Sequence, residues 1–124
     1  MLGTVEINYK GTKIPLRFNN WAFFALLEDF KVNPDKAMER IQEIQDKEGV
    51  MGVVKLVVRY GDLGYAKENQ IDLRMSDKDI HSYVSSGSLH EMLTLVQEFS
   101  KWCLGIMSPE EEAETPKKKV TKKR

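Results

Sequence analysis

Apolar and polar side chains alternate along two short runs at the start of the chain. Residues 4–9 (TVEINY) and 13–18 (KIPLRF) each alternate in type, and residues 10–12 (KGT) lie between them. A period of two is typical of half-buried strands, and a short connection containing glycine between two such runs is typical of a hairpin. We therefore predict a β-hairpin over residues 4–18.

An unusually apolar helix is predicted directly after the hairpin. Asn19 and Asn20 can cap it, and residues 21–30 (WAFFALLEDF) follow. Because successive residues turn by about 100° around a helix, several large apolar side chains fall on one broad side, which we expect to face the core. They are Phe23, Phe24, Leu26, Leu27 and Phe30.

Trp21 falls on the opposite stripe of this helix, together with Ala25 and Glu28. Two interpretations stay open. An exposed tryptophan beside a small residue and an acid is a suitable anchor for a binding partner. Large aromatic side chains are also highly buried on average, so Trp21 could instead cover the hairpin by packing on Ile14 or Leu16.

The next helix is predicted to start at Asn33, with Pro34 in its first position, and to end at Gly49. Residues 50–60 are rich in valine, which by propensity could form a buried strand, but a run this short has no period that separates strand from helix. Residues 61–64 (GDLG) are predicted to form a turn. The apolar stripe of the helix before Gly49 consists of Ala37, Met38, Ile41 and Ile44.

Two further helices complete the predicted domain. Ser76 with Asp79 three residues later is close to a capping box, and residues 85–88 (SSGS) break the helix that it starts. Ile80, Tyr83 and Val84 are expected to face inward. The last helix has apolar residues at spacings of three and four. They are Leu89, Met92, Leu93, Val96, Phe99, Cys103 and Leu104.

These elements predict an α+β fold: an N-terminal β-hairpin packed on a mainly helical domain of four or five helices. A length of 124 residues suits one domain, which we place at residues 1–107. Residues 108–124 are almost entirely charged, polar or proline and cannot bury a core, so we predict a disordered charged tail.

Composition and charge exclude several classes of protein. Residues 1–108 contain 13 Lys and Arg against 15 Asp and Glu, a net charge of −2, whereas residues 109–124 contain 6 against 4, a net charge of +2. The predicted domain therefore has no basic footprint for nucleic acid. The first residues do not resemble a signal peptide, and no apolar run reaches the roughly 20 residues of a membrane span. Cys103 is the single cysteine and is expected to be an inert buried thiol.

Catalytic and metal-binding patterns are weak. His81, His90 and Cys103 would make an incomplete zinc set, since a structural site needs four ligands. Neighbouring acids such as Asp77 and Asp79 are usually solvated on a helix flank, whereas acid–base catalysis needs carboxylates in different environments. We therefore expect a protein that is not an enzyme, with no catalytic residues, metal, cofactor or small-molecule substrate.

Three segments carry a resemblance to a known family. Residues 11–19 (GTKIPLRFN), followed by an aromatic and leucine-rich helix, resemble the start of the small tail assembly chaperones of long-tailed bacteriophages and prophages. Residues 60–65 (YGDLGY) and 73–80 (LRMSDKDI) resemble a turn and a helix start in the middle of the same family. The resemblance covers roughly residues 3–106, and it favours a helix rather than a strand for residues 50–60.

The resemblance implies a function in virion assembly. It implies that the chain coats and solubilises the tape-measure protein, a very long helical protein with exposed apolar stripes, and helps to recruit tail tube subunits in the cytoplasm of the bacterial host. Repeated contacts along that rod would favour self-association into an open head-to-tail array. We expect the partner-binding residues to be Trp21, Phe24, Glu28 and Met92.

The lysine-rich end of the chain leaves other interpretations open. Residues 116–124 (PKKKVTKKR) can be a solvated tail, a contact for nucleic acid, or a short basic signal for nuclear import. The three consecutive lysines at 117–119 also require A-rich codons, and tail assembly chaperones often end at such a site of programmed frameshifting. The alternative function is thus a small non-enzymatic adaptor whose basic tail contacts nucleic acid or directs nuclear import.

Overall fold

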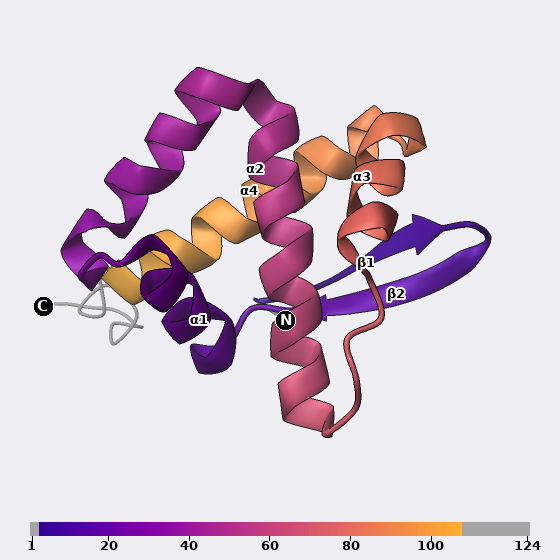
Figure 1. Ribbon diagram of the computed structural model, residues 1–124, viewed down its shortest axis with the longest axis horizontal. Helices are drawn as coiled ribbons and strands as arrows, with labels where there is room; N and C mark the ends of the chain where they lie inside the picture. The colour runs from indigo at the N-terminus through magenta and orange to yellow at the C-terminus, as the bar shows by residue number, and fades with distance from the viewer. Residues whose placement is uncertain (1–2, 108–124) are drawn as a thin grey trace, which may run out of the picture.

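The computed structural model describes residues 3–107 and confirms the predicted α+β fold, with a β-hairpin followed by a helical domain (Figure 1). The tail predicted for residues 108–124 lies outside the described residues. The elements in chain order are β1 (Thr4–Tyr9), β2 (Thr12–Arg17), α1 (Asn20–Phe30), the short 3₁₀ helix η1 (Pro34–Lys36), α2 (Ala37–Asn69), α3 (Asp77–Ser86) and α4 (Leu89–Met107). In Figure 1, α2 rises on the left, turns at the top and runs down the middle of the molecule, with α1 at the lower left and the hairpin and α3 on the right.

The hairpin forms as predicted, with β2 beginning at Thr12 rather than Lys13. β1 and β2 are antiparallel, with Ile7 opposite Ile14. The two-residue turn consists of Lys10 and Gly11, whose φ angles of 50° and 78° match the twist of a tight hairpin. Ile7, Ile14 and Leu16 are all buried, so one face of the hairpin is part of the core.

α2 differs most from the prediction. It continues through residues 50–60, which confirms the helix there, and also through residues 61–64, so the predicted turn at Gly61–Gly64 is wrong. Gly49 has a φ angle of 77° and kinks the helix at the residue where the sequence predicted its end. Asn33 precedes η1 rather than α2, and its side chain makes no capping hydrogen bond.

The glycines at 61 and 64 allow β2 and the residues after it to lie against the backbone of α2. A β-carbon on Gly61 would come within 2.7 Å of Cβ of Leu16, and one on Gly64 would overlap the carbonyl oxygen of Arg17. Any side chain at Gly64 would therefore push the hairpin away from α2. Close approach, rather than a change of chain direction, explains this pair of glycines.

Asp62 lies between these glycines and is a buried carboxylate with a full set of partners. Its Oδ2 accepts hydrogen bonds from the backbone N–H groups of Arg74 and Met75, both at 2.9 Å, and its Oδ1 accepts one from Nε of Arg74 at 2.9 Å. The guanidinium of Arg74 also donates through Nη2 to the carbonyl oxygen of Pro15 at 2.5 Å. One turn of α2 thus holds both the hairpin and the connection between α2 and α3.

The two C-terminal helices begin and end near the predicted positions. Ser76 and Asp79 form a complete capping box at the start of α3, and the N–H of Gly87 donates to the carbonyl oxygen of Tyr83 at 2.7 Å where α3 ends. Burial of Ile80, Tyr83 and Val84 is confirmed. The carboxylate of Glu91 in α4 accepts hydrogen bonds from the hydroxyl of Tyr83 at 2.6 Å and from the side chain of Asn8 at 2.7 Å. This carboxylate therefore joins α3 and β1 to α4.

The core face of α4 is rotated from the predicted one. Leu89, Leu93 and Leu104 are exposed, whereas Leu95 and Trp102 are buried. Spacings of three and four fit two neighbouring stripes of this helix, and the stripe that meets the hairpin and α2 is the one with the aromatic residues. Its buried members are Met92, Leu95, Phe99, Trp102 and Cys103.

Replacing Gly64 with alanine tests the close crossing. Gly64→Ala should lower the free energy of unfolding by about 3 kcal/mol, because the methyl group forces the hairpin away from α2. Gly11→Ala in the hairpin turn is the matched control: a β-carbon there meets nothing within 4 Å, so only the positive φ is costly, at about 1–2 kcal/mol. Urea unfolding followed by circular dichroism measures both values, and equal losses would contradict the close crossing.

Candidate functional site

The titratable residues do not form a metal-binding cluster in the described part of the chain. No group of three or more His, Cys, Asp and Glu residues within residues 3–107 could hold a metal ion. His81 and His90 are both exposed, on α3 and α4 respectively. Cys103 is buried as predicted, and burial raises the pKa of its thiol to about 12. A thiol with such a pKa is almost wholly protonated near neutral pH and is therefore a poor nucleophile.

An exposed aromatic surface is the most distinctive feature of α1. Trp21 is 51% exposed and Phe24 is 62% exposed, and the acid Glu28 is exposed on the same side of the helix. We call these three residues the aromatic face. With Asn19 and Asn20, the two aromatic side chains line a hollow of about 320 Å³.

The structure shows that Trp21 is exposed rather than packed on the hairpin, and that Phe24 does not face the core. Trp21 has half of its surface in solvent and is not a core residue. Phe24 was expected to face the core, but it follows Trp21 by three residues and shares its side of the helix. The buried side consists of Ala22, Phe23 and Leu26.

The start of α1 is fixed by side chains that reach α2. Asn19 caps α1 by accepting the N–H of Ala22 on its Oδ1 at 3.1 Å, and its Nδ2 donates to the carbonyl oxygen of Gly64 at 3.0 Å. Glu68 accepts hydrogen bonds from Asn19 and Arg17, and both hold the pKa of its carboxyl below the usual value. The first turn of α1, which carries Trp21, is therefore anchored to α2.

A cluster of buried aromatic rings packs against the inner side of α1. The ring of Phe23 lies edge-on to Trp102, with 5.8 Å between the centroids, and Phe18 packs on Phe99 at 5.4 Å and on Trp102 at 5.7 Å. Phe24 lies next to this cluster, with its centroid 6.5 Å from that of Phe23. The aromatic face is thus the outer side of a helix whose inner side is tightly packed, which suits a preformed binding surface.

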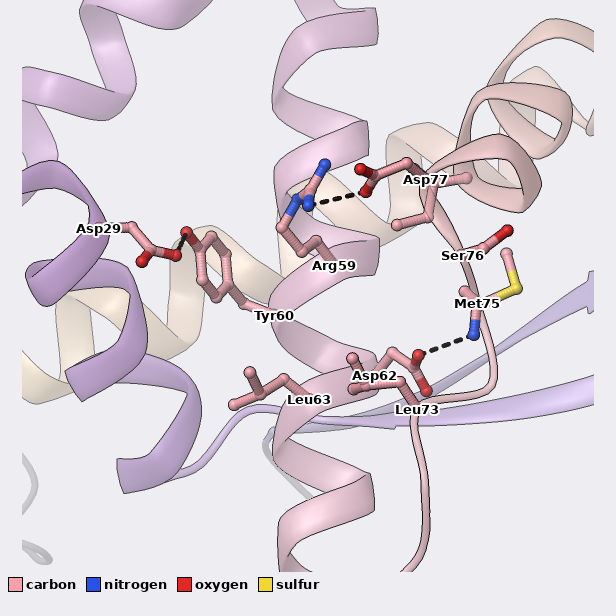
Figure 2. A pocket seen from close by; sticks show the side chains of 10 residues that line it. Asp29, Arg59, Tyr60, Asp62, Leu63, Leu73, Met75, Ser76 and Asp77 are labelled. Carbon is pink, nitrogen blue, oxygen red and sulfur yellow. Dashed lines mark hydrogen bonds and ion pairs between the residues drawn. The ribbon is translucent and has the colours of Figure 1, made fainter.

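A second hollow, of about 360 Å³, lies between α1, α2, the connection before α3, and α3 (Figure 2). Its polar groups are bonded to one another: the hydroxyl of Tyr60 donates to Asp29 at 2.5 Å, and Arg59 pairs with Asp77 at 2.8 Å. Burial and the bond to Asp29 raise the pKa of Tyr60 well above its ordinary value, so the hydroxyl remains a donor. These pairs join helices together, and we assign the hollow a structural role.

Met92 does not belong to any exposed surface. It was expected to contact a partner, but it is only 2% exposed and belongs to the core of the domain. Met92 precedes Phe99 by seven residues and Cys103 by eleven, so it shares their buried side of α4, whereas Leu89 and Leu93 lie outside. The exposed positions of Trp21, Phe24 and Glu28 agree with the predicted binding surface, but they do not identify what binds there.

Sequence reasoning missed two exposed apolar groups. One is Ile71 and Leu73 in the connection after α2, and the other is the outer side of α4. Ile71 and Leu73 alternate with polar residues at 70, 72 and 74, and this alternation is visible in the sequence. No helix or strand was predicted there, so the sequence did not indicate whether the two side chains face the core or the solvent. Together with Leu63, they border a further hollow of about 340 Å³.

Comparison of the chain with protein-family models, with curated proteins and with solved structures finds no match. Among residues 3–107, no helix combines the length and apolar character needed to cross a bilayer.

The two tryptophans provide a matched test of the site. Trp21→Ala should change the free energy of unfolding by less than about 1 kcal/mol, since the side chain lies at the surface. Trp102→Ala should lower it by about 3–5 kcal/mol, because it removes a buried ring from the aromatic cluster. Urea unfolding followed by circular dichroism measures both, and similar losses in the two variants would place Trp21 in the core.

Proposed function

We propose that this protein is a tail assembly chaperone of a tailed phage or prophage. It coats and solubilises the tape-measure protein in the cytoplasm of the bacterial host and helps to recruit tail tube subunits. The observation that carries the proposal is the aromatic face, two large exposed side chains on a helix whose other side is firmly packed. The resemblance of residues 11–19 to that family supports it independently.

The physical basis of the proposed function is masking. A long helical protein with apolar stripes aggregates when these stripes face water, and covering them removes the apolar area from solvent. Tryptophan and phenylalanine supply large contact areas with few rotatable bonds, which is why aromatic residues dominate binding energy at many interfaces. The hollow beside Trp21 and Phe24 could accept one apolar side chain of a partner helix.

The size of the aromatic face suits a reversible contact. Two aromatic side chains and their surroundings are smaller than the roughly 800 Å² per partner of a standard stable interface. Each copy would then bind weakly, and many copies along one rod would together keep it soluble. Weak individual contacts also allow the coat to leave when tube subunits assemble.

Co-expression with a tape-measure segment tests this proposal. A tagged full-length chain should keep soluble, and recover, a segment of the tape-measure protein of the same phage or prophage. Trp21→Ala and Phe24→Ala should each reduce recovery about tenfold, equivalent to about 1.4 kcal/mol. The matched control is Leu73→Ala, which removes an equally exposed apolar side chain outside the aromatic face and should not change recovery.

If the folded Trp21→Ala, Phe24→Ala and Leu73→Ala variants recover equal amounts of the segment, the aromatic face does not bind it. Failure of the unmodified chain to solubilise the segment would contradict the chaperone function itself. In that case a gel shift of labelled DNA that depends on salt, and that is lost when residues 109–124 are deleted, would favour the adaptor instead.

A further inference from the structure

α2 bends sharply at Gly49, between an N-terminal arm of residues 37–48 and a C-terminal arm of residues 50–69 (Figure 1). Gly49 has φ and ψ angles of 77° and −168°, and it is the one residue of this fully described helix whose angles are not helical. Such a combination of angles is essentially restricted to glycine. If Gly49 adopted helical angles, the two arms would form one continuous helix.

The same bend explains a second glycine. A β-carbon on Gly52 would lie 2.5 Å from Cβ and 2.8 Å from Oε1 of Glu48. In a regular helix the β-carbons of residues four apart are about 5–6 Å from each other. The bend folds Glu48 onto Gly52 and thereby excludes a side chain there. We call Gly49 and Gly52 the glycine corner.

Glycine at both positions favours the bend over a straight α2. In a regular helix glycine is a poor residue, because it loses the most backbone freedom on folding, whereas alanine is the best helix former. In the bend, alanine at position 49 would be strained and alanine at position 52 would collide with Glu48. Alanine at either position therefore disfavours the bend and favours the straight helix at the same time.

The glycine corner divides the chain into two parts that share one core. The N-terminal part, residues 3–48, contains the hairpin and α1, and the C-terminal part, residues 50–107, contains α3 and α4. Phe18 of the N-terminal part packs on Phe99 and Trp102 of the C-terminal part. Straightening α2 would move the two parts of one chain away from each other and expose this core to water.

We propose that the glycine corner is a hinge that decides whether the N-terminal part packs on its own chain or on a second copy of this chain. With the corner bent, each chain is a closed monomer. With α2 straight, the N-terminal part of one copy packs on the C-terminal part of the other and the reverse, so both cores are complete. The second copy is the fitting occupant because it presents the same contacts, and short strained hinges favour such an exchange.

The balance between the two forms lies at the corner itself. The closed monomer and the exchanged dimer have the same contacts elsewhere, and the dimer additionally loses the translational and rotational freedom of one chain. Glycine adopts a positive φ at little cost, so straightening Gly49 relieves little strain. We therefore expect the wild-type protein to be closed at micromolar concentration. The aromatic face has no part in the exchange, so the inference does not depend on the proposed function.

Sedimentation velocity of the full-length chain tests the hinge. At micromolar concentration the wild-type protein should have the mass of one chain, whereas Gly49→Ala and Gly52→Ala should each reach that of at least two. Gly11→Ala is the matched control. Gly11 also has a positive φ, of 78°, and a β-carbon there meets nothing within 4 Å, but it lies in the hairpin turn. This variant should be less stable than wild type and remain a monomer.

Cross-linking identifies the segment that is exchanged. Arg17 of the N-terminal part and Glu68 of the C-terminal part form an ion pair at 3.2 Å. A tagged chain with Arg17→Cys and an untagged chain with Glu68→Cys, both carrying Gly49→Ala, are refolded together and treated with a short bis-maleimide. The two kinds of chain should be linked about tenfold more than in the same mixture with Gly49 retained. Buried Cys103, whose pKa is about 12, should not react.

Refolding the mixture that retains Gly49 gives a test that does not require the alanine variants to fold. The two parts share one core, so they separate only when the domain unfolds, and exchange is decided during refolding. Links between chains should be more frequent after refolding at high micromolar than at nanomolar concentration. Equal linking at both concentrations, folded Gly49→Ala and Gly52→Ala variants that stay monomeric, or oligomers without links between Arg17→Cys and Glu68→Cys would each overturn the proposal. Equal oligomerisation of Gly11→Ala would overturn it too.

Discussion

Contact between the hairpin and the backbone of α2 is the constraint on which the rest of the structure depends. β2 and the residues after it approach one turn of α2 so closely that there is no room for a side chain at positions 61 and 64, both of which are glycine. Between them, Asp62 accepts three hydrogen bonds from Arg74 and Met75. Removing one partner from a buried pair of this kind typically costs about 3–5 kcal/mol, because the other charge is left without compensation.

The position of α1 follows from the same turn of α2. The chain between β2 and α1 passes over Gly64. Asn19 in this segment both caps α1 and donates a hydrogen bond to the carbonyl oxygen of Gly64. The inner side of α1 then meets the aromatic cluster through Phe23, which leaves Trp21 and Phe24 outside. The exposure of these two residues is therefore a consequence of how α1 is anchored, and the proposed binding surface is preformed.

Sequence patterns predicted the elements better than their arrangement. The hairpin, the cap at Asn19 and the capping box at Ser76 are local features, and local hydrogen bonding determines each of them. Glycine at 61 and 64 was misassigned because a glycine required for close approach cannot be told from a turn glycine without knowledge of what crosses it. The resemblance to a phage family contributed the same error, since it matched residues 60–65 to a turn.

The candidate surfaces show the same limit. Helical periodicity placed Trp21 opposite the apolar side of α1 but did not exclude that it covers the hairpin. Phe24 lies at the edge of its stripe, where a small rotation of the helix decides burial. For α4, tertiary packing chose the stripe with Phe99 and Trp102 over the neighbouring one with Leu89 and Leu93. Both stripes are visible in the sequence, but the sequence alone does not show which of them faces the core.

Amide hydrogen exchange of Arg74 and Met75, measured by NMR, tests the central role of this turn most directly. Both N–H groups are bonded to the buried carboxylate of Asp62, although they belong to a connection outside the helices. If the turn holds the domain together, they should exchange as slowly as the amides of Val57 and Val58 inside α2, that is, only through global unfolding. Exchange as fast as that of the neighbouring exposed Asp72 would contradict the account.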